Sequence, residues 1–412
     1  MDDVMEEIYD PFDSQVQHDP YPVYRTLREH HPAYWCERRG FWVLSRYDDV
    51  YNALHDWETF SSSKGVFPTS EPGAEGMDMA DTLLPMMIMM DPPRHTALRK
   101  LISRGFTPRR IAALEPAVEE LAGGLFDSIL KGSDGGHCDI VRDFAGPLPA
   151  IVIADLLGLP REDRTQFREW SSALAEGDPT SRENRESSLV ALGNLYQYFG
   201  DVIERCRQTP GDDLITALVQ AEVDGEKLSD SELLGFCLLL LIAGHETTTN
   251  LLGNAAAQLA AHPDQRALLA ADERLLPGAV EELLRYDSPV QGLSRTLTRD
   301  VVIHGETMRA GQTVLLLFGS ANRDERVFPD PDRLDVARKQ DHQVALGHGV
   351  HFCLGASLAR LEARIALSLM INRMPGWELD PTVAPTRMES GPIRGYKSLP
   401  ITWSSSADHR SA

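Results

Sequence analysis

A single cysteine set among regularly spaced glycines constrains this chain more than any other feature. Residues 345–355 read Ala-Leu-Gly-His-Gly-Val-His-Phe-Cys-Leu-Gly, so that Cys353 follows Gly347 and Gly349 and precedes Gly355. Glycine adopts φ values that other residues avoid, and it lets a backbone approach a flat ligand closely. The next fourteen residues have helical apolar spacing and strong helix formers. The pattern therefore predicts a cysteine held on a tight loop at a helix N-terminus.

This setting favours a metal-bound thiolate. The helix N-terminus stabilises a thiolate by only about 0.3–2 kcal/mol, whereas a coordinated thiol is deprotonated outright. A structural zinc site needs four ligands, and no C-x-x-C pair is present. One thiolate beneath a planar macrocycle fits haem iron. The alternative is a buried, inert thiol, which is the interpretation we favour for the remaining cysteines, Cys36, Cys138, Cys206 and Cys237.

The stretch resembles the haem-ligand loop of the cytochrome P-450 superfamily, the haem-thiolate monooxygenases, in the form found in soluble bacterial members of actinobacterial type. It differs at Leu346, seven residues before the cysteine, where the family most often has Phe. The resemblance implies haem b as the cofactor and Cys353 as the ligand of its iron. Gly347, His351 and Gly355 would also contact the cofactor.

The same resemblance implies the fold: mainly α with small β-sheets, arranged as a triangular helical prism around a buried haem. One haem domain would cover residues 1–403, and residues 404–412 form a polar tail. A composition of 42% hydrophobic and 25% charged residues can supply a sizeable core.

Charge and hydropathy narrow the surroundings of the protein. A formal charge of -22 argues against nucleic acid and anionic membranes as partners. The longest apolar run, residues 233–243, is too short to span a bilayer, and residues 1–12 lack a leader pattern. The odd number of cysteines agrees with a reducing compartment. We therefore expect a soluble, cytoplasmic protein.

Periodicity predicts helices joined by a few short strands. Predicted helices cover residues 21–30, 47–55, 144–159, 166–175 and 188–206. Predicted strands cover residues 33–36, 41–45, 292–295 and 313–318, with another pair near Val301. Residues 61–85 and 176–186 predict loops. A capping box at Ser229 and Glu232 begins a helix without a breaker until His262, about 50 Å at 1.5 Å per residue.

Polar residues interrupt this long apolar helix at 243–249, Ala-Gly-His-Glu-Thr-Thr-Thr. Buried polar groups cost free energy unless they are satisfied or useful. The segment resembles the family's A-G-x-E-T oxygen-binding groove. Ala243 and Gly244 would then contact the haem, Thr247 would hydrogen-bond dioxygen, and Glu246 would help to deliver protons through water. The alternative is that the threonines bond back to the preceding helical turn.

The roles of several scattered basic residues can be assigned only from this resemblance. His95 and Arg99 are four apart on one helix face after Asp-Pro-Pro, a pattern similar to the family's haem-propionate clamp. By the same resemblance, Arg295 and His351 are further propionate contacts.

A second, structural cluster is implied in the same way. Glu282, Arg285 and Arg333 resemble the buried Glu-Arg-Arg cluster of the family, which stabilises the core on the haem side.

By resemblance the function is monooxygenation, in which dioxygen is used to hydroxylate or epoxidise an apolar small molecule with electrons from a ferredoxin and its reductase. Two alternatives stay open: a family member that performs oxidative coupling or peroxide-driven chemistry, and a haem sensor or carrier without turnover. Residues expected to line an apolar substrate pocket are Met86, Met87, Leu239, Ile242, Ala243, Val290 and Leu293. They do not choose between a lipid, a terpenoid, a polyketide and an aromatic compound.

A local basic segment predicts where the electron donor docks. Residues 94–110 contain six basic side chains and no acidic one, in a chain of net charge -22. Charges more than about 8 Å away are largely screened at physiological ionic strength, so a partner would sense this segment. We expect Lys100, Arg104 and Arg109 to steer an acidic ferredoxin. The alternative is that they are ordinary solvated side chains.

Overall fold

The computed structural model describes residues 7–68, 85–103, 105–132, 136–163, 166–167, 169–170, 182–211, 213–223, 225–339 and 342–403. Arg104, the tail 404–412, most of the predicted helix 166–175 and the first part of the loop 176–186 lie outside the described residues. Residues 182–186 belong to a helix, α10, which is longer than the 188–206 predicted from periodicity.

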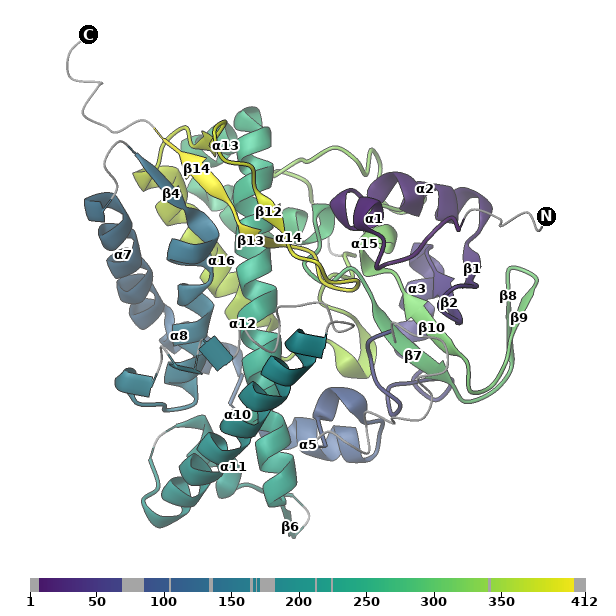
Figure 1. The fold of residues 1–412 in the computed structure, drawn as a ribbon, viewed down its shortest axis with the longest axis horizontal. Coiled ribbons are helices and arrows are strands. Elements are labelled where there is room, and N and C mark those ends of the chain that lie inside the picture. The colour runs from purple at the N-terminus through teal and green to yellow at the C-terminus, as the bar shows by residue number, and fades with distance from the viewer. Residues whose placement is uncertain are drawn as a thin grey trace.

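Helices dominate the fold (Figure 1). The α-helices are α1 (Ser14–His18), α2 (Tyr21–His30), α3 (Tyr47–His55), α5 (Arg94–Ile102), α6 (Pro108–Ala113), α7 (Glu115–Gly132), α8 (Pro147–Leu156), α10 (Arg182–Gln208), α11 (Leu214–Val219), α12 (Asp230–Ala261), α13 (Pro263–Ala271), α14 (Leu276–Tyr286), α15 (Phe318–Ala321) and α16 (Ala356–Arg373). Short 3-10 turns are η2 (Met87–Met89), η4 (Arg161–Asp163), η5 (Glu273–Leu275) and η6 (Gly349–His351), and η3 (Val141–Ala145) is a π-helical turn.

The strands form small sheets. The largest, in the order β1-β2-β10-β7-β3, contains β1 (Ala33–Cys36), β2 (Phe41–Leu44), β3 (Phe60–Ser61), β7 (Leu293–Leu297) and β10 (Thr313–Leu316). A second, in the order β11-β14-β4, contains β4 (His137–Asp139), β11 (Glu378–Leu379) and β14 (Pro400–Thr402). Two-stranded pairs are β5 (Glu222–Val223) with β6 (Glu226–Lys227), β8 (Val301–Ile303) with β9 (Glu306–Met308), and β12 (Thr386–Arg387) with β13 (Tyr396–Ser398).

Strand pairing joins segments that are far apart in the sequence. β2 runs parallel to β10, with Trp42 opposite Val314, and β14 runs antiparallel to β4, with Ile401 opposite Cys138. In Figure 1 the largest sheet and helices α1 to α3 form one region of the molecule. Helices α7, α8, α10 and α16 lie around α12 in the other region. Each of these two sheets therefore combines segments that are far apart in the sequence.

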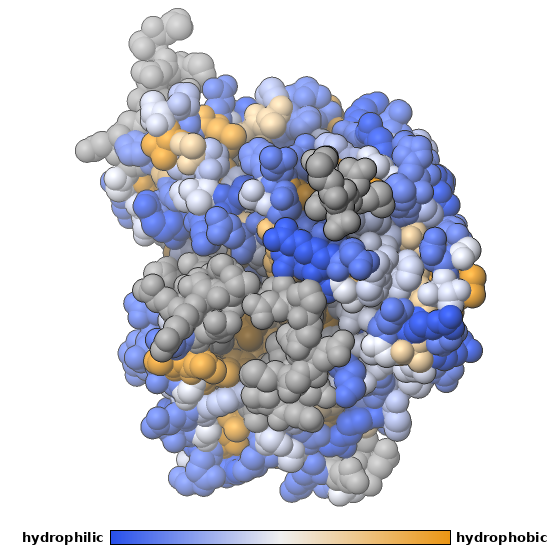
Figure 2. All heavy atoms as spheres, turned by 45° about the vertical axis from the view of Figure 1, so that its right-hand side comes forward, coloured by the Kyte–Doolittle hydropathy of each residue, from blue (hydrophilic) through white to orange (hydrophobic). Residues whose placement is uncertain are grey.

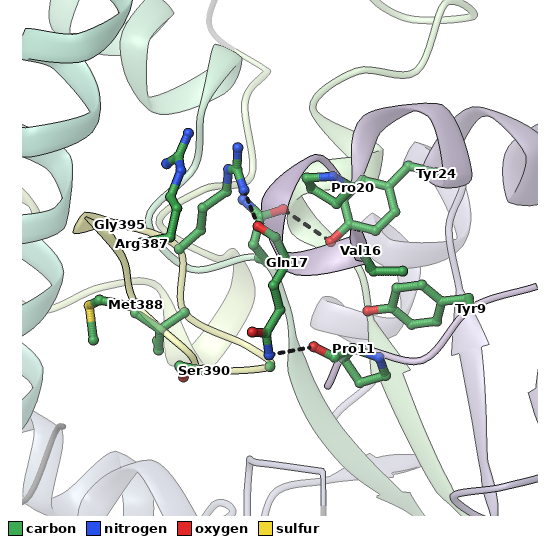
Figure 3. A pocket seen from close by; sticks show the side chains of 14 residues that line it. Tyr9, Pro11, Val16, Gln17, Pro20, Tyr24, Arg387, Met388, Ser390 and Gly395 are labelled. Carbon is green, nitrogen blue, oxygen red and sulfur yellow. Dashed lines mark hydrogen bonds between the residues drawn. The ribbon is translucent and has the colours of Figure 1, made fainter. Parts of the chain in front are cut away.

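The N-terminal segment also contacts a C-terminal loop directly (Figure 3). The Arg394 guanidinium donates to the carbonyl of Gln17 at 2.6 Å, and the Tyr24 hydroxyl donates to Gln291 Oε1 at 3.0 Å. A cavity of about 20 Å³ remains between these parts, room for about one water molecule. Its lining includes none of the residues expected to contact substrate.

Helix α12 is the central element of the helical region. Ser229 caps it through the predicted capping box, in which its side chain accepts from the Glu232 N–H and the Glu232 carboxylate accepts from the Ser229 N–H. The helix is 32 residues long and packs against α8, α10 and α16. Its apolar composition thus reflects burial inside the protein, and in the part of the chain that the structure describes no helix is long and apolar enough to cross a membrane.

The predicted helix 144–159 is two elements in the structure. Residues 141–145 form the π-helical turn η3, closed by a hydrogen bond from the Gly146 N–H to the Val141 carbonyl at 2.8 Å. The regular helix α8 begins only at Pro147. Proline fits the first turn of a helix, where no N–H is needed, so the regular hydrogen-bond pattern restarts there.

The buried ionic cluster differs from its prediction in one member. Glu282 and Arg285 are both fully buried, and the guanidinium binds both carboxylate oxygens at 2.8 Å. The second arginine on Glu282 is Arg338, at 3.2 Å, and the Asp335 N–H also donates to this carboxylate. The assignment of Arg333 was wrong: its side chain is 66% exposed and faces Asp335, and only its backbone carbonyl accepts from Arg285 and Arg338.

This correction gives a prediction with a matched control. Arg338→Ala should lower the free energy of unfolding by about 1.5–3 kcal/mol, because it removes a charge-assisted bond from a buried carboxylate. Arg333→Ala should change it by less than about 0.5 kcal/mol, as for an exposed side chain. Guanidinium unfolding of the haem-loaded proteins measures both. Equal effects of the two substitutions would contradict the corrected cluster.

Candidate active site

The Cys353 loop is fixed by its own backbone. Gly347 and Gly349 both have a φ of 67°, a conformation that strains other residues. The Cys353 N–H donates to the Leu346 carbonyl at 2.9 Å, and α16 begins three residues later. Cys353 is half-buried at the end of this loop, as the glycine pattern predicts.

Burial and nearby groups shift the pKa of the Cys353 thiol in opposite directions. Burial raises the pKa of Cys353, while the N–H of Gly355 and the positive charges of Arg99 and Arg360 lower it. Arg99 reaches the loop itself, because its guanidinium donates to the carbonyl of Phe352. Burial outweighs these groups and leaves the pKa of the thiol above its usual value, so the donor and the positive charges only partly offset the cost of a thiolate here.

Four basic side chains predicted to contact propionates gather beside this loop. The imidazole rings of His95 and His351 lie 4.3 Å apart, centre to centre. Burial, together with the nearby charges of Arg295 and Arg99, lowers the pKa of His351 to about 3. The structure therefore brings His95, Arg99, Arg295 and His351 together from α5, β7 and the cysteine loop.

The side chains of this cluster have more hydrogen-bonding nitrogens than hydrogen-bond partners. His95 is 1% exposed, and neither of its ring nitrogens has a hydrogen-bond partner. Burial, with help from Arg99, lowers its pKa to about 4. Arg295 is 3% exposed, donates to the Ser294 carbonyl at 2.7 Å, and has its pKa lowered by burial to about 10. Buried donors of this kind fit an anionic ligand such as the carboxylates of a haem.

Residues that the sequence did not single out hold this cluster in place. Asp91 accepts from the Ser61 hydroxyl at 2.5 Å and from the Ser62 N–H at 3.0 Å. The Ser62 hydroxyl in turn lies 3.2 Å from His351 Nε2. Asp91 stands in the Asp-Pro-Pro motif, so its position beside His95 was visible, but its serine partners come from residues 30 positions away.

The predicted oxygen groove on α12 has a mixed outcome. Ala243 is exposed, as a residue that faces a ligand would be. Gly244 has a different neighbour, because a Cβ added there would lie 2.6 Å from Ile153 Cδ1 of α8. Its small size is thus needed for the packing of two helices, and its contact with haem stays a prediction.

The threonine hydroxyls make the local bonds that the alternative interpretation described. Thr247 donates to the Ala243 carbonyl at 2.7 Å, and Thr249 donates to the His245 carbonyl at 3.1 Å. A hydroxyl that donates to its own helix still has lone pairs with which to accept a bond. Glu246 accepts from the side-chain amide of Asn250 at 3.4 Å, and Asn250 lies one helical turn further along α12.

The expected substrate-contacting residues belong to two separate hydrophobic clusters. Leu239 and Ile242 are partly buried on α12, against which η2 packs with Met87. Met86 and Met87 are 6% and 7% exposed, so both are core residues in this structure. The remaining two, Val290 and Leu293, are partly buried against the core of the largest sheet.

One buried carboxyl group was missed by the sequence reasoning. Glu362 on α16 is 1% exposed, its Oε2 has no hydrogen-bond partner, and burial raises its pKa to about 8. Helical spacing after Cys353 predicted the helix but not which of its faces is buried. An acidic residue in an apolar face would have been the signal.

Comparisons with known proteins agree with this arrangement. Residues 183–402 match the family model described as Cytochrome P450. The chain is 41% identical over 398 residues to a putative cytochrome P450 123 from Mycobacterium tuberculosis, covering 96% of this chain and 97% of that protein. It is 42% identical over 403 residues to a vitamin D(3) 25-hydroxylase from Pseudonocardia autotrophica, covering 96% of each.

A solved structure extends the similarity to three dimensions. The crystal structure of CYP109E1 from Bacillus megaterium in complex with testosterone has a TM-score of 0.83 and 36% sequence identity, over 93% of this chain and 99% of that one. The chain belongs to the cytochrome P450 family: it has the cytochrome P450 fold, binds haem and is a monooxygenase. The fold, cofactor and reaction class expected from the cysteine stretch are thereby confirmed.

The cluster of His95, Arg99, Arg295 and His351 leads to a prediction about haem retention. Arg295→Ala should release haem about ten- to a hundredfold faster, because a charge-assisted bond contributes about 1.5–3 kcal/mol. Transfer of haem to an excess of apomyoglobin measures this rate without any need for turnover. Arg299→Ala is the control, since that side chain is 69% exposed and faces Asp56. Equal rates for both variants would contradict the propionate role of Arg295.

Proposed function

We propose that this chain hydroxylates or epoxidises an apolar, lipid-like small molecule within one haem domain spanning residues 1–403, in which Cys353 would hold the haem iron. The observation that carries the proposal is the half-buried Cys353 thiol beside a cluster of buried basic side chains with unused donors. The names of two similar proteins support the substrate class, since one is a vitamin D(3) hydroxylase and another was crystallised with testosterone.

Several residues are positioned to hold the cofactor. Cys353 would ligate the iron, with Gly347 and Gly355 beside it, and Ala243 and Gly244 of α12 would lie on the other face. His95, Arg99, Arg295 and His351 would bind the propionates. When bound, haem supplies the redox chemistry that activates dioxygen, and a thiolate ligand donates electron density that favours O–O cleavage.

The residues of α12 would manage protons. Thr247 donates to the Ala243 carbonyl at 2.7 Å, so its hydroxyl oxygen points a lone pair away from that bond. Rotation about the side chain would let the same hydroxyl donate to dioxygen. Glu246, which already accepts from Asn250, would relay protons through water as a general acid.

An apolar surface suits the proposed substrate class. Figure 2 shows hydrophobic surface near the middle of one face. Concave, mostly apolar sites are the usual sites for small apolar ligands. Met86, Met87, Leu239, Ile242, Ala243, Val290 and Leu293 would supply the contacts. A shift of the Soret band on addition of candidate compounds, followed by detection of oxygenated product with NADH, a ferredoxin and its reductase, tests this proposal.

Thr247→Ala should preserve haem content and substrate affinity but waste electrons. Loss of a bond of about 0.5–1.5 kcal/mol would shift the partition between hydrogen peroxide and product by up to about tenfold. The ratio of NADH consumed to product formed measures this. Thr249→Ala is the matched control, because Thr249 makes the same bond back to its helix but is buried. If both variants couple like the wild type, Thr247 has no proton role.

The electron donor would approach the basic segment on α5 and α6. Lys100 and Arg109 are exposed, while Arg94 is paired with Glu232 and Arg99 binds the Phe352 carbonyl. Because Arg99 bonds to the residue beside Cys353, Lys100 lies close to the cysteine loop. An acidic ferredoxin would be attracted to this surface.

Reversal of Lys100 and Arg109 to Glu should slow the first electron transfer from ferredoxin about tenfold at low salt, the lower end of electrostatic steering effects. The carbon monoxide spectrum should stay unchanged. The control reverses Lys397 of β13 and the 91% exposed Arg274, which make the same change in net charge on other elements. Stopped-flow reduction measures the rate, and equal slowing in both double variants would contradict a local docking surface.

A further inference from the structure

Two histidine side chains meet on the surface beside the cysteine loop. His55 is exposed in the last turn of α3, and His348 is half-buried in the loop that leads to Cys353. Their ring centres lie 5.8 Å apart, with 35° between the ring planes. The ring of Tyr51 packs against both, at 4.4 Å from His55 and 5.0 Å from His348.

Each imidazole has one nitrogen oriented by the backbone. His55 Nδ1 lies 2.8 Å from the Tyr51 carbonyl, so this nitrogen carries the proton and Nε2 keeps its lone pair. The His348 ring also has a hydrogen-bonding interaction with the backbone of Gln343. A ring N–H bound to a backbone carbonyl is the usual outer contact of a metal-ligating histidine.

We propose that His55 and His348 form a surface site for a divalent transition-metal ion such as Zn²⁺, with water as the other ligands. Metal–nitrogen bonds of about 2.0–2.1 Å at a tetrahedral angle place two imidazole centres about 5 Å apart, close to the 5.8 Å between these two rings. Imidazole nitrogen suits Zn²⁺, Cu²⁺ and Ni²⁺. Within the described ranges no group of three or more His, Cys, Asp or Glu could hold a metal, which is why water must complete the site.

The position of this site gives it a structural consequence. The Gly349 backbone packs directly against the Leu54 carbonyl, so the end of α3 already touches the cysteine loop. The ring of Phe352, next to Cys353, lies 6.2 Å from that of His348. An ion shared by His55 and His348 would cross-link α3 to this loop and restrain the segment that carries the thiol.

Zn²⁺ binding to the haem-loaded protein tests the proposal. Competition with a chromogenic chelator, after dialysis against EDTA, should show a Zn²⁺ site in the wild type. His55→Ala and His348→Ala should each weaken it by about tenfold or more, the scale reached even by changes to outer contacts of metal ligands. His18→Ala is the control and should bind Zn²⁺ like the wild type. His18 is exposed, and in the described part of the chain its ring contacts no other aromatic ring.

The two substitutions must act on the same ion. The double variant should bind Zn²⁺ only slightly more weakly than the single variant with the lower Zn²⁺ affinity. One remaining histidine already holds the ion poorly, so its loss adds little. Undiminished binding in either single variant would overturn the proposal, as would absence of binding in the wild type. Should His348→Ala fail to accumulate, His348→Asn and the exposed His55→Ala decide the outcome.

Discussion

Buried basic groups beside the Cys353 loop are only partly compensated by the protein, in which Asp91 is the carboxylate that acts on Arg295 and His95. Arg295 is almost fully buried and donates to the Ser294 carbonyl, and neither ring nitrogen of His95 has a hydrogen-bond partner. Desolvation of such groups costs several kcal/mol unless hydrogen bonds or opposite charge offset it. The carboxylates of haem would supply both. The local structure is therefore organised for a cofactor that contributes to the stability of the folded protein.

The rest of the fold brings distant segments to that position. His95 comes from α5, Arg295 from β7 and His351 from the cysteine loop, while α12 provides the exposed Ala243. β2 pairs with β10, and β4 pairs with β14, so each pairing joins segments that are far apart in the sequence. A rigid helix packed against α8, α10 and α16 keeps Glu246 and Thr247 at a fixed height along its axis. Function near the thiol thus depends on long-range packing.

What the sequence could predict were features with a local physical signature. Glycine spacing identified the Cys353 loop, and the capping box located the start of α12. It could not distinguish Arg333 from Arg338, because both lie more than 50 residues after Glu282 and only the path of the chain after residue 333 decides which side chain turns inward. Nor could it show that Gly244 accommodates Ile153, a contact between residues 91 positions apart. The π-helical turn η3 likewise depends on the packing around Val141.

Ligation of the iron by Cys353 is the central claim, and the spectrum of the reduced protein under carbon monoxide tests it most directly. The wild type should show the strongly red-shifted Soret band of thiolate ligation, and Cys353→Ala should lose it. Cys237→Ala should keep the band, because that cysteine is buried within α12 and its pKa is raised by burial. A wild-type protein without the red-shifted band, or a Cys353→Ala variant that retains it, would contradict the account.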